Sequence, residues 1–159
     1  AFLYGAGNTK IGYTYDKQLS EVEANKKGKE IRKAYVDAIP GLKELLEAVH
    51  KASERGYVRG LDNRRILVDS RHKSLNYLIQ GSSAIIAKKW LVLANERLPE
   101  HTHQLAFIHD ELQFETKKEN VDELKFTLEL SAAEAGEYYK LRTPIAAESK
   151  SGRDWSQVH

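Results

Sequence analysis

Apolar positions recur with the period of an α-helix in four stretches of the chain, which predicts four helices. They cover residues 20–38, 41–55, 73–97 and 120–138. The first has Ser20 as a candidate N-cap and Glu23 three residues later, the pattern of a capping box, and Pro40 stops it. The helix over 73–97 is the longest and has a broad apolar face, so we expect it to be buried against a sheet.

Short runs of β-forming residues predict two hairpins and one further strand. The strands are expected over 57–60, 65–68, 104–108, 111–116 and 144–148. Asp and Asn in the turn over 61–64 are typical turn residues. The strand over 104–108 is apolar without alternation, which indicates that both of its faces are covered. With a connector or short helix over 8–15, the order of elements predicts an α+β fold.

The composition fits one domain or a part of a larger one: 159 residues, of which 41% are hydrophobic and 30% charged. We expect no membrane span and no signal peptide, because the chain has neither an apolar run of about 18 residues nor a basic leader before an apolar stretch. The absence of cysteine excludes disulfides and thiolate metal sites, and it is compatible with the cytoplasm.

Positive charge is local, since the net charge is only +2. The basic residues gather in three clusters: Lys26, Lys27, Lys29, Arg32 and Lys33; Arg64 and Arg65; and Arg71, His72 and Lys73. Such clusters can contact phosphates, although a solvated surface is the alternative for each of them.

The strongest chemical signal is a pair of adjacent carboxylates between two predicted strands. The run is Ile108-His109-Asp110-Glu111-Leu112. Metal-dependent phosphoryl transfer uses two hard cations about 3.5–4 Å apart, which need carboxylate oxygens as ligands. Asp110 and Glu111 are therefore candidate catalytic residues, with an ordinary solvated turn as the alternative.

A second signal lies on the long helix, where Asn76 and Gln80 are four residues apart and share one face. His72 joins that face if the helix begins early enough. Side-chain amides can donate to purine N3 and pyrimidine O2 in the minor groove, acceptors that every base pair offers. The alternative is that these amides are simply the solvent side of the helix.

Together these motifs resemble the C-terminal part of a family A (DNA polymerase I type) DNA polymerase, in particular the replicative enzymes of phages. Four blocks carry the resemblance in the same order: Phe2-Leu3-Tyr4-Gly5-Ala6-Gly7, Gly60-Leu61-Asp62-Asn63-Arg64-Arg65 with Ser70-Arg71-His72, Leu75-Asn76-Tyr77-Leu78-Ile79-Gln80-Gly81-Ser82, and Ile108-His109-Asp110-Glu111. They are similar to the end of the fingers helix (motif B), the hairpin before the long palm helix, that helix itself, and motif C.

The resemblance implies a role for each carboxylate of the hairpin. Asp110 matches the metal-binding aspartate of motif C, and Glu111 matches the neighbouring acid with a lesser role. His109 stands where the family contacts the primer end. The implied reaction is attack of a primer 3′-hydroxyl on the α-phosphate of a dNTP, with two Mg²⁺ ions as cofactors.

The resemblance also implies contacts with primer–template DNA. Asn76 and Gln80 match minor-groove contacts, and His72 falls where the phage enzymes also carry a histidine. Tyr4 matches the last tyrosine of motif B, near the templating base. The family architecture assigns residues 1–56 to the end of the fingers helices and 57–159 to the palm, as antiparallel hairpins packed on long helices.

The departures from the family pattern concern what lies outside these residues. Residues 1–7 read like the end of an apolar helix at a glycine stop and the sequence has no Met, so we expect an internal boundary there. Motif A, with the other metal-bridging aspartate, has no counterpart in the sequence. We therefore expect the chain alone to be inactive and to need an N-terminal partner that carries motif A, in the cytoplasm of a phage-infected bacterium.

Two other classes of function stay open from the residues. A non-catalytic DNA-binding module would use the long helix and the basic clusters, and it would bind DNA without Asp110. A metalloprotein would use His101, His103 and His109 as ligands, since two histidines in a His-x-His pattern on a strand can face one side. Pro99 before them favours an ordinary loop instead.

Overall fold

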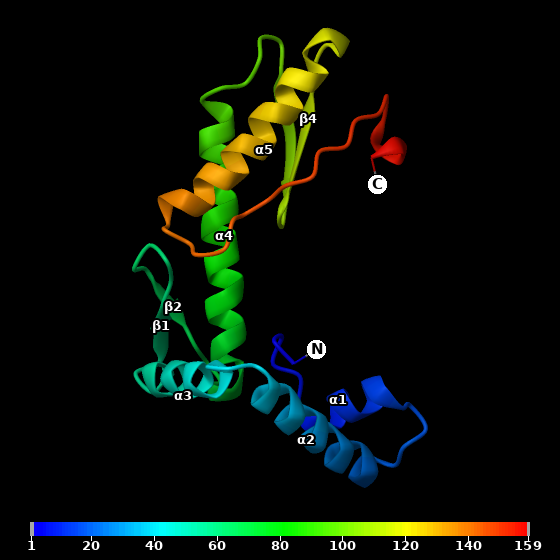
Figure 1. Ribbon diagram of the computed structural model, residues 1–159, viewed down its shortest axis with the longest axis vertical. Helices are drawn as coiled ribbons and strands as arrows, with labels where there is room; N and C mark the ends of the chain where they lie inside the picture. Colours follow the sequence, from blue (N-terminus) through cyan, green and yellow to red (C-terminus); the bar gives the residue numbers. More distant parts are fainter. Residues whose placement is uncertain (1, 159) are drawn as a thin grey trace. The chain divides into compact units, whose positions relative to one another are not determined.

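The computed structural model describes residues 2–158, which form five α-helices and two antiparallel two-stranded sheets (Figure 1). The helices are α1 (Asn8–Tyr15), α2 (Glu21–Ala38), α3 (Leu42–Ser53), α4 (Ser74–Asn95) and α5 (Val121–Tyr138), and the strands are β1 (Tyr57–Arg59), β2 (Arg65–Leu67), β3 (His103–Ile108) and β4 (Glu111–Glu115). The predicted α+β class is confirmed. The chain divides into two compact units, a first unit that ends at Gly81 and a second unit that begins at Ser82.

The N-terminal half of the first unit is a pair of packed helices. The predicted capping box is present, because the Ser20 hydroxyl accepts a hydrogen bond from the Glu23 backbone N–H and the Glu23 carboxylate accepts one from the Ser20 N–H. α2 ends at Ala38, before Pro40, as predicted. Residues 8–15 form the short helix α1, which lies directly against α2 at Gly12 and Gly28.

The C-terminal half of the first unit encloses a small apolar core between α3, the β1–β2 hairpin and the start of α4. Its buried centre is Val49, Val58 and Leu75, with Leu46, Ala52, Ile66, Val68 and Leu78 packed around it. Val58 pairs with Ile66 across the hairpin, so both strands direct one apolar residue to this core. A 3₁₀ turn (η1, Arg71–Lys73) precedes α4.

The second unit packs α4, α5 and the β3–β4 hairpin around another core. Ala94, Leu124 and Leu128 are its buried centre, and Trp90, Leu98, Leu112 and Phe114 pack against them. The Trp90 indole N–H donates to the Leu128 carbonyl oxygen at 2.8 Å, which joins α4 to α5. Leu112 and Phe114 alternate along β4, so this strand turns one face toward the helices.

The prediction of a strand over 144–148 was wrong, because these residues form no regular secondary structure and belong to neither sheet. The segment packs against α5 instead. A Cβ at Gly136 would lie 2.8 Å from Ile145 Cγ1, so glycine at this position lets the isoleucine side chain approach the helix. The apolar side chain that suggested a strand is half-buried beside a helix surface.

The expectation that both faces of the strand over 104–108 are covered was also wrong. In β3, Leu105 is 61% exposed and Ile108 is 43% exposed. The sheet has two strands, and its strand pairing shifts between Gln104 and Ala106, so the apolar residues of β3 do not all reach the core.

Residues 1–7 were expected to be the end of a helix, but residues 2–5 form a turn. Ala1 lies outside the described residues. The Gly5 N–H donates to the Phe2 carbonyl oxygen at 3.0 Å, and Gly5 has a φ of 73°, which glycine adopts readily. The predicted glycine stop is present without the helix. None of the helices in residues 2–158 is long and apolar enough to cross a membrane.

Candidate active site

The two candidate carboxylates lie at the closed end of the β3–β4 hairpin. Ile108 pairs with Glu111, so only His109 and Asp110 form the connecting turn. His109 has a φ of 55°, a left-handed conformation that is uncommon for residues other than glycine and tolerated by histidine more than by most. The strands fix both ends of the turn, which leaves the Asp110 carboxylate exposed at a defined place.

Glu111 is held differently from Asp110, although the two are adjacent. It is half-buried, and its carboxylate accepts a hydrogen bond from the Gln113 side-chain amide. Residues i and i+2 of a strand share a face, which explains why Gln113 reaches it. Residues 111 and 113 are two positions apart in a predicted strand, so the sequence already placed them on one face, but Gln113 was not predicted as a site residue.

Carboxylate oxygens at this turn suit a hard divalent cation, which prefers oxygen ligands. No group of three or more histidine, cysteine, aspartate or glutamate side chains in residues 2–158 is arranged to hold a metal ion. The described chain therefore offers Asp110, with Glu111 beside it, as part of a ligand set. The remaining ligands would have to be water, substrate phosphates or other protein groups.

The candidate DNA-contacting residues of α4 lie in the first unit. Gln80 is exposed, whereas the Asn76 side-chain oxygen is buried and has no hydrogen-bond partner within residues 2–158. His72 lies in the 3₁₀ turn before α4, so it does not continue the Asn76/Gln80 helical face as a residue of the α-helix itself. Its Nδ1 lies 2.8 Å from the Ser70 hydroxyl.

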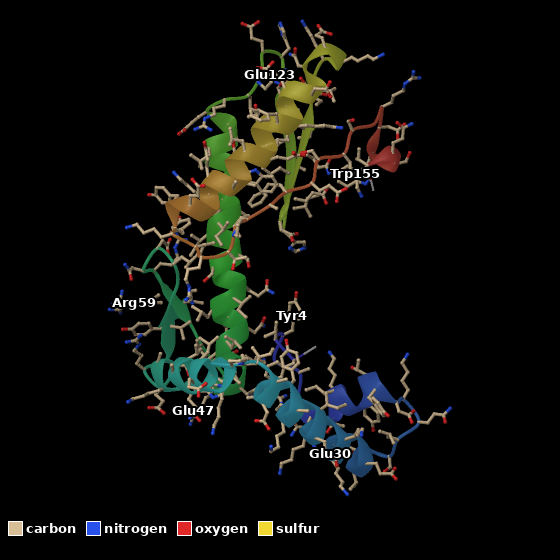
Figure 2. All side chains as sticks on the ribbon, viewed as in Figure 1. Tyr4, Glu30, Glu47, Arg59, Glu123 and Trp155 are labelled. Carbon is tan, nitrogen blue, oxygen red and sulfur yellow. The ribbon has the colours of Figure 1, made fainter. Side chains whose placement is uncertain are left out.

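His72 and Asn76 do share a cavity of about 200 Å³. Its other walls are Phe2, Leu3, Gly5, Arg32, Val36, Leu46, His50 and Leu75. The cavity brings the start of α4 next to the turn that carries Tyr4, whose side chain is 68% exposed (Figure 2). Tyr4, His72 and Asn76 thus belong to one region of the first unit.

Arg32 anchors that turn from α2. Its guanidinium donates to the Ala6 carbonyl oxygen and, at 2.7 Å, to the Asn8 side-chain oxygen, and it lies 4.9 Å from the centre of the Phe2 ring. Burial lowers the pKa of Arg32 from its usual value. The sequence placed this residue in a basic cluster able to contact phosphates, with a solvated surface as the alternative, and its contacts show a structural role instead.

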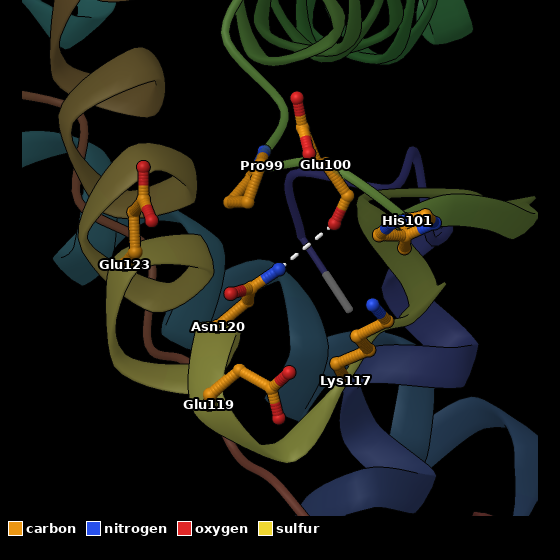
Figure 3. A pocket seen from close by; sticks show the side chains of 7 residues that line it. All are labelled: Pro99, Glu100, His101, Lys117, Glu119, Asn120 and Glu123. Carbon is orange, nitrogen blue, oxygen red and sulfur yellow. Dashed lines mark hydrogen bonds between the residues drawn. The ribbon is translucent and has the colours of Figure 1, made fainter.

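A larger cavity, of about 370 Å³, lies away from the carboxylates at the open end of the β3–β4 hairpin (Figure 3). It is lined by Pro99, Glu100, His101, Lys117, Glu119, Asn120 and Glu123, and the Asn120 amide donates to the Glu100 carbonyl oxygen at 2.8 Å. His101 lines this cavity, whereas His109 is at the other end of the hairpin. The three histidines of the metalloprotein hypothesis are not brought together.

Comparisons with known proteins show which family the chain resembles. The family model described as DNA polymerase family A matches residues 1–157. The DNA-directed DNA polymerase of Enterobacteria phage T3 is 29% identical and that of Escherichia phage T7 28% identical, each over 99% of this chain and 25% of the relative. DNA polymerase I of Aquifex aeolicus is 28% identical over 93% of this chain and 26% of the relative.

The fold is similar as well. A solved structure of the POL domain of Pol1 from M. smegmatis, in complex with DNA primer-template and dNTP, has a TM-score of 0.76 and 25% sequence identity. It matches 98% of this chain and 29% of that chain. The chain spans about a quarter of the length of the curated relatives named above. The family match covers nearly every residue, and the chain belongs to DNA polymerase family A.

Proposed function

We propose that this chain is the part of a DNA-directed DNA polymerase that supplies the motif C carboxylates for template-directed nucleotidyl transfer. The observation that carries the proposal is the exposed Asp110 at the closed end of a two-stranded hairpin, within a chain that matches the polymerase family over residues 1–157. Residues 1–56 would belong to the fingers and residues 57–159 to the palm.

In this proposal Asp110 would be a ligand of Mg²⁺, one of two such ions in the complete site. The chemistry that a bound ion would supply is neutralisation of charge on the transferring phosphoryl group and on the attacking oxygen. Asp110 contributes a carboxylate whose backbone is fixed by strand pairing, and Glu111, held by Gln113, supports it as the weaker neighbour. His109 would contact the primer end from the same turn.

The proposed DNA contacts come from the first unit. Gln80 and Asn76 would donate amide hydrogens to minor-groove acceptors that every base pair presents, and so check pair geometry without reading sequence. His72 would contact the DNA nearby, and Tyr4 would lie beside the templating base. The exposure of Gln80 and Tyr4 leaves both side chains accessible to such a partner.

We further propose that these 159 residues alone do not extend a primer. The described carboxylates do not complete a metal site, and motif A would have to come from an N-terminal part of the polymerase. That part, primer–template DNA and a dNTP are the proposed partners. The phage relatives favour the cytoplasm of an infected bacterium as the place of action.

Primer extension tests the proposal. The chain would be mixed with a polypeptide carrying the polymerase segments that its relatives have and it lacks, on a labelled primer–template with Mg²⁺ and dNTPs. We expect extension by the mixture and none by the chain alone. Asp110→Asn should lower extension about 10³-fold, because several kcal/mol of charge stabilisation disappear, whereas the exposed control Asp122→Asn should not.

Each outcome has a separate meaning. Extension by the chain alone would disprove its dependence on a partner. If the chain binds DNA equally well with and without Asp110→Asn, and the mixture that contains the unchanged chain extends no primer, a non-catalytic DNA-binding module would be favoured over a polymerase fragment.

A further inference from the structure

The outer face of the β1–β2 hairpin carries arginines that no part of the polymerase proposal uses. Strand pairing sets Arg59 opposite Arg65 and Tyr57 opposite Leu67. Because side chains alternate along a strand, these four residues share one face, and the residues between them point to the core. The face is open to solvent, with Leu67 78% exposed.

Ring stacking orders two of the guanidinium groups on this face. The guanidinium carbons of Arg55 and Arg65 lie 4.6 Å and 4.8 Å from the centre of the Tyr57 ring. Arg59, which Figure 2 labels on the hairpin, donates to the Asn63 carbonyl oxygen at 3.0 Å. We call Arg55, Arg59 and Arg65 around Tyr57 the arginine face. Its cations are already held in place, so less side-chain freedom is given up when they bind a ligand.

The charges of the arginine face are not balanced by carboxylates. Within residues 2–158, none of its arginines has an acidic group within ion-pair distance. The neighbouring Arg64, in contrast, is paired with Asp62. Like charges directly opposite each other on a hairpin disfavour folding, so the Arg59–Arg65 pair is unfavourable in the free chain. An anion bound across both would remove that repulsion.

We infer that the arginine face binds the phosphate backbone of DNA, as a contact separate from the amides of Asn76 and Gln80. Charge complementarity carries the inference, since a phosphodiester strand offers regularly spaced anions and guanidinium groups bind phosphate oxygens in pairs. The inference rests on the proposed function only in taking DNA as the polyanion. Contacts of this kind are independent of sequence and strongly dependent on salt.

Salt dependence of DNA binding distinguishes this surface from the helix amides. The affinity of the intact chain for a labelled primer–template and for a labelled single strand would be measured by anisotropy over a range of salt concentrations. Each phosphate that the protein neutralises contributes about 0.9 to the logarithmic salt slope on a duplex and about 0.7 on a single strand. Arg59→Gln with Arg65→Gln should therefore reduce the slope by about 1.8 or about 1.4, according to the DNA bound.

Three comparison variants separate charge from folding. Arg59→Lys with Arg65→Lys keeps the charge and should keep most of the slope, although it removes the stacked guanidinium. Lys117→Gln with Lys118→Gln makes the same charge change beside the carboxylates that line the larger cavity, and should leave the slope unchanged. Asn76→Ala with Gln80→Ala should weaken binding at every salt concentration without changing the slope.

The outcomes are distinct. An unchanged slope in the Arg59/Arg65 glutamine variant, with weaker binding in the Asn76/Gln80 variant, would overturn the arginine face and leave the polymerase proposal standing. A chain that binds no DNA even at low salt would overturn both. Binding of an acidic peptide through these arginines, with DNA binding unaffected, would identify a protein partner and also overturn the inference.

Discussion

The contact between α1 and α2 predicts that Gly28→Ala will lower the stability of the first unit. A Cβ at Gly28 would lie 1.8 Å from the Asn8 carbonyl oxygen and 3.0 Å from the Gly12 backbone nitrogen. The reciprocal position is as close, because a Cβ at Gly12 would lie 1.9 Å from the Ala24 carbonyl oxygen. Both obstacles are backbone atoms, which cannot rotate away, so α1 as a whole would have to move.

Two effects of opposite sign set the magnitude. Alanine is the better helix former, which by itself would stabilise α2 by about 1 kcal/mol. Overpacking a tight contact typically costs about 1–3 kcal/mol. Moving α1 would also stretch the hydrogen bond from Arg32 to Asn8, and bonds to charged groups contribute about 1.5–3 kcal/mol. We expect a net decrease of about 3 kcal/mol in the unfolding free energy of the first unit.

Urea denaturation followed by two probes measures this change. Far-ultraviolet circular dichroism reports all helices, whereas Trp90 and Trp155 both lie in the second unit and report that unit by fluorescence. We expect the circular dichroism transition to shift or split and the fluorescence transition to stay. The exposed neighbour Lys29→Ala is the matched control and should change neither. If Gly28→Ala instead raises stability by the helix-propensity increment, the close approach of the two helices is refuted.

Two further variants test residues of the candidate site. Asn76→Leu removes a buried oxygen that has no partner among the described residues and has a cavity beside it. Urea denaturation should show an unfolding free energy higher by about 1–2 kcal/mol, while primer extension by the reconstituted mixture falls. A decrease in stability would mean that the oxygen has a hydrogen-bond partner after all. His109→Gly relieves the strain of a left-handed backbone at a residue with a side chain. It should stabilise the second unit by up to about 1 kcal/mol in a melt followed by Trp90 fluorescence, and it should reduce primer extension. Unchanged extension would remove His109 from the proposed primer contacts.

Local signals explain why most elements were predictable. The capping box at Ser20 and Glu23 and the break at Pro40 fix α2 within the chain segment itself. The turn at His109 and Asp110 was equally clear, because polar residues separate an apolar strand from a strand in which apolar and polar residues alternate. The segment at 144–148 could not be placed in this way. Its half-buried isoleucine is compatible with a strand or with a helix surface, and only the glycine on α5 decides between them.

The candidate site was predictable to the extent that it depends on residue type and spacing along one element. Residue type and spacing alone were enough to place Asp110 at a turn and Gln80 on a helix surface. The buried oxygen of Asn76 depends on how three helices and a turn meet around a cavity, and the arginine face depends on strand pairing that sets Arg59 opposite Arg65. Neither arrangement leaves a pattern in the sequence, because the residues involved are not periodic with one another.

Three of the unfavourable local features in the described part of the chain lie at residues proposed to act on DNA. Within residues 2–158, the chain keeps an acceptor without a partner at Asn76, a left-handed histidine at position 109 and facing cations at Arg59 and Arg65. Asn63 is a useful contrast, since it is also left-handed but is a residue that accepts this conformation easily in a turn.

Local strain and unbalanced polar groups persist where function requires them. If that is their cause here, relieving each feature should raise stability and weaken a DNA-dependent readout in the same variant. A variant that gained stability with its DNA binding and primer extension intact would show that its feature is unrelated to function.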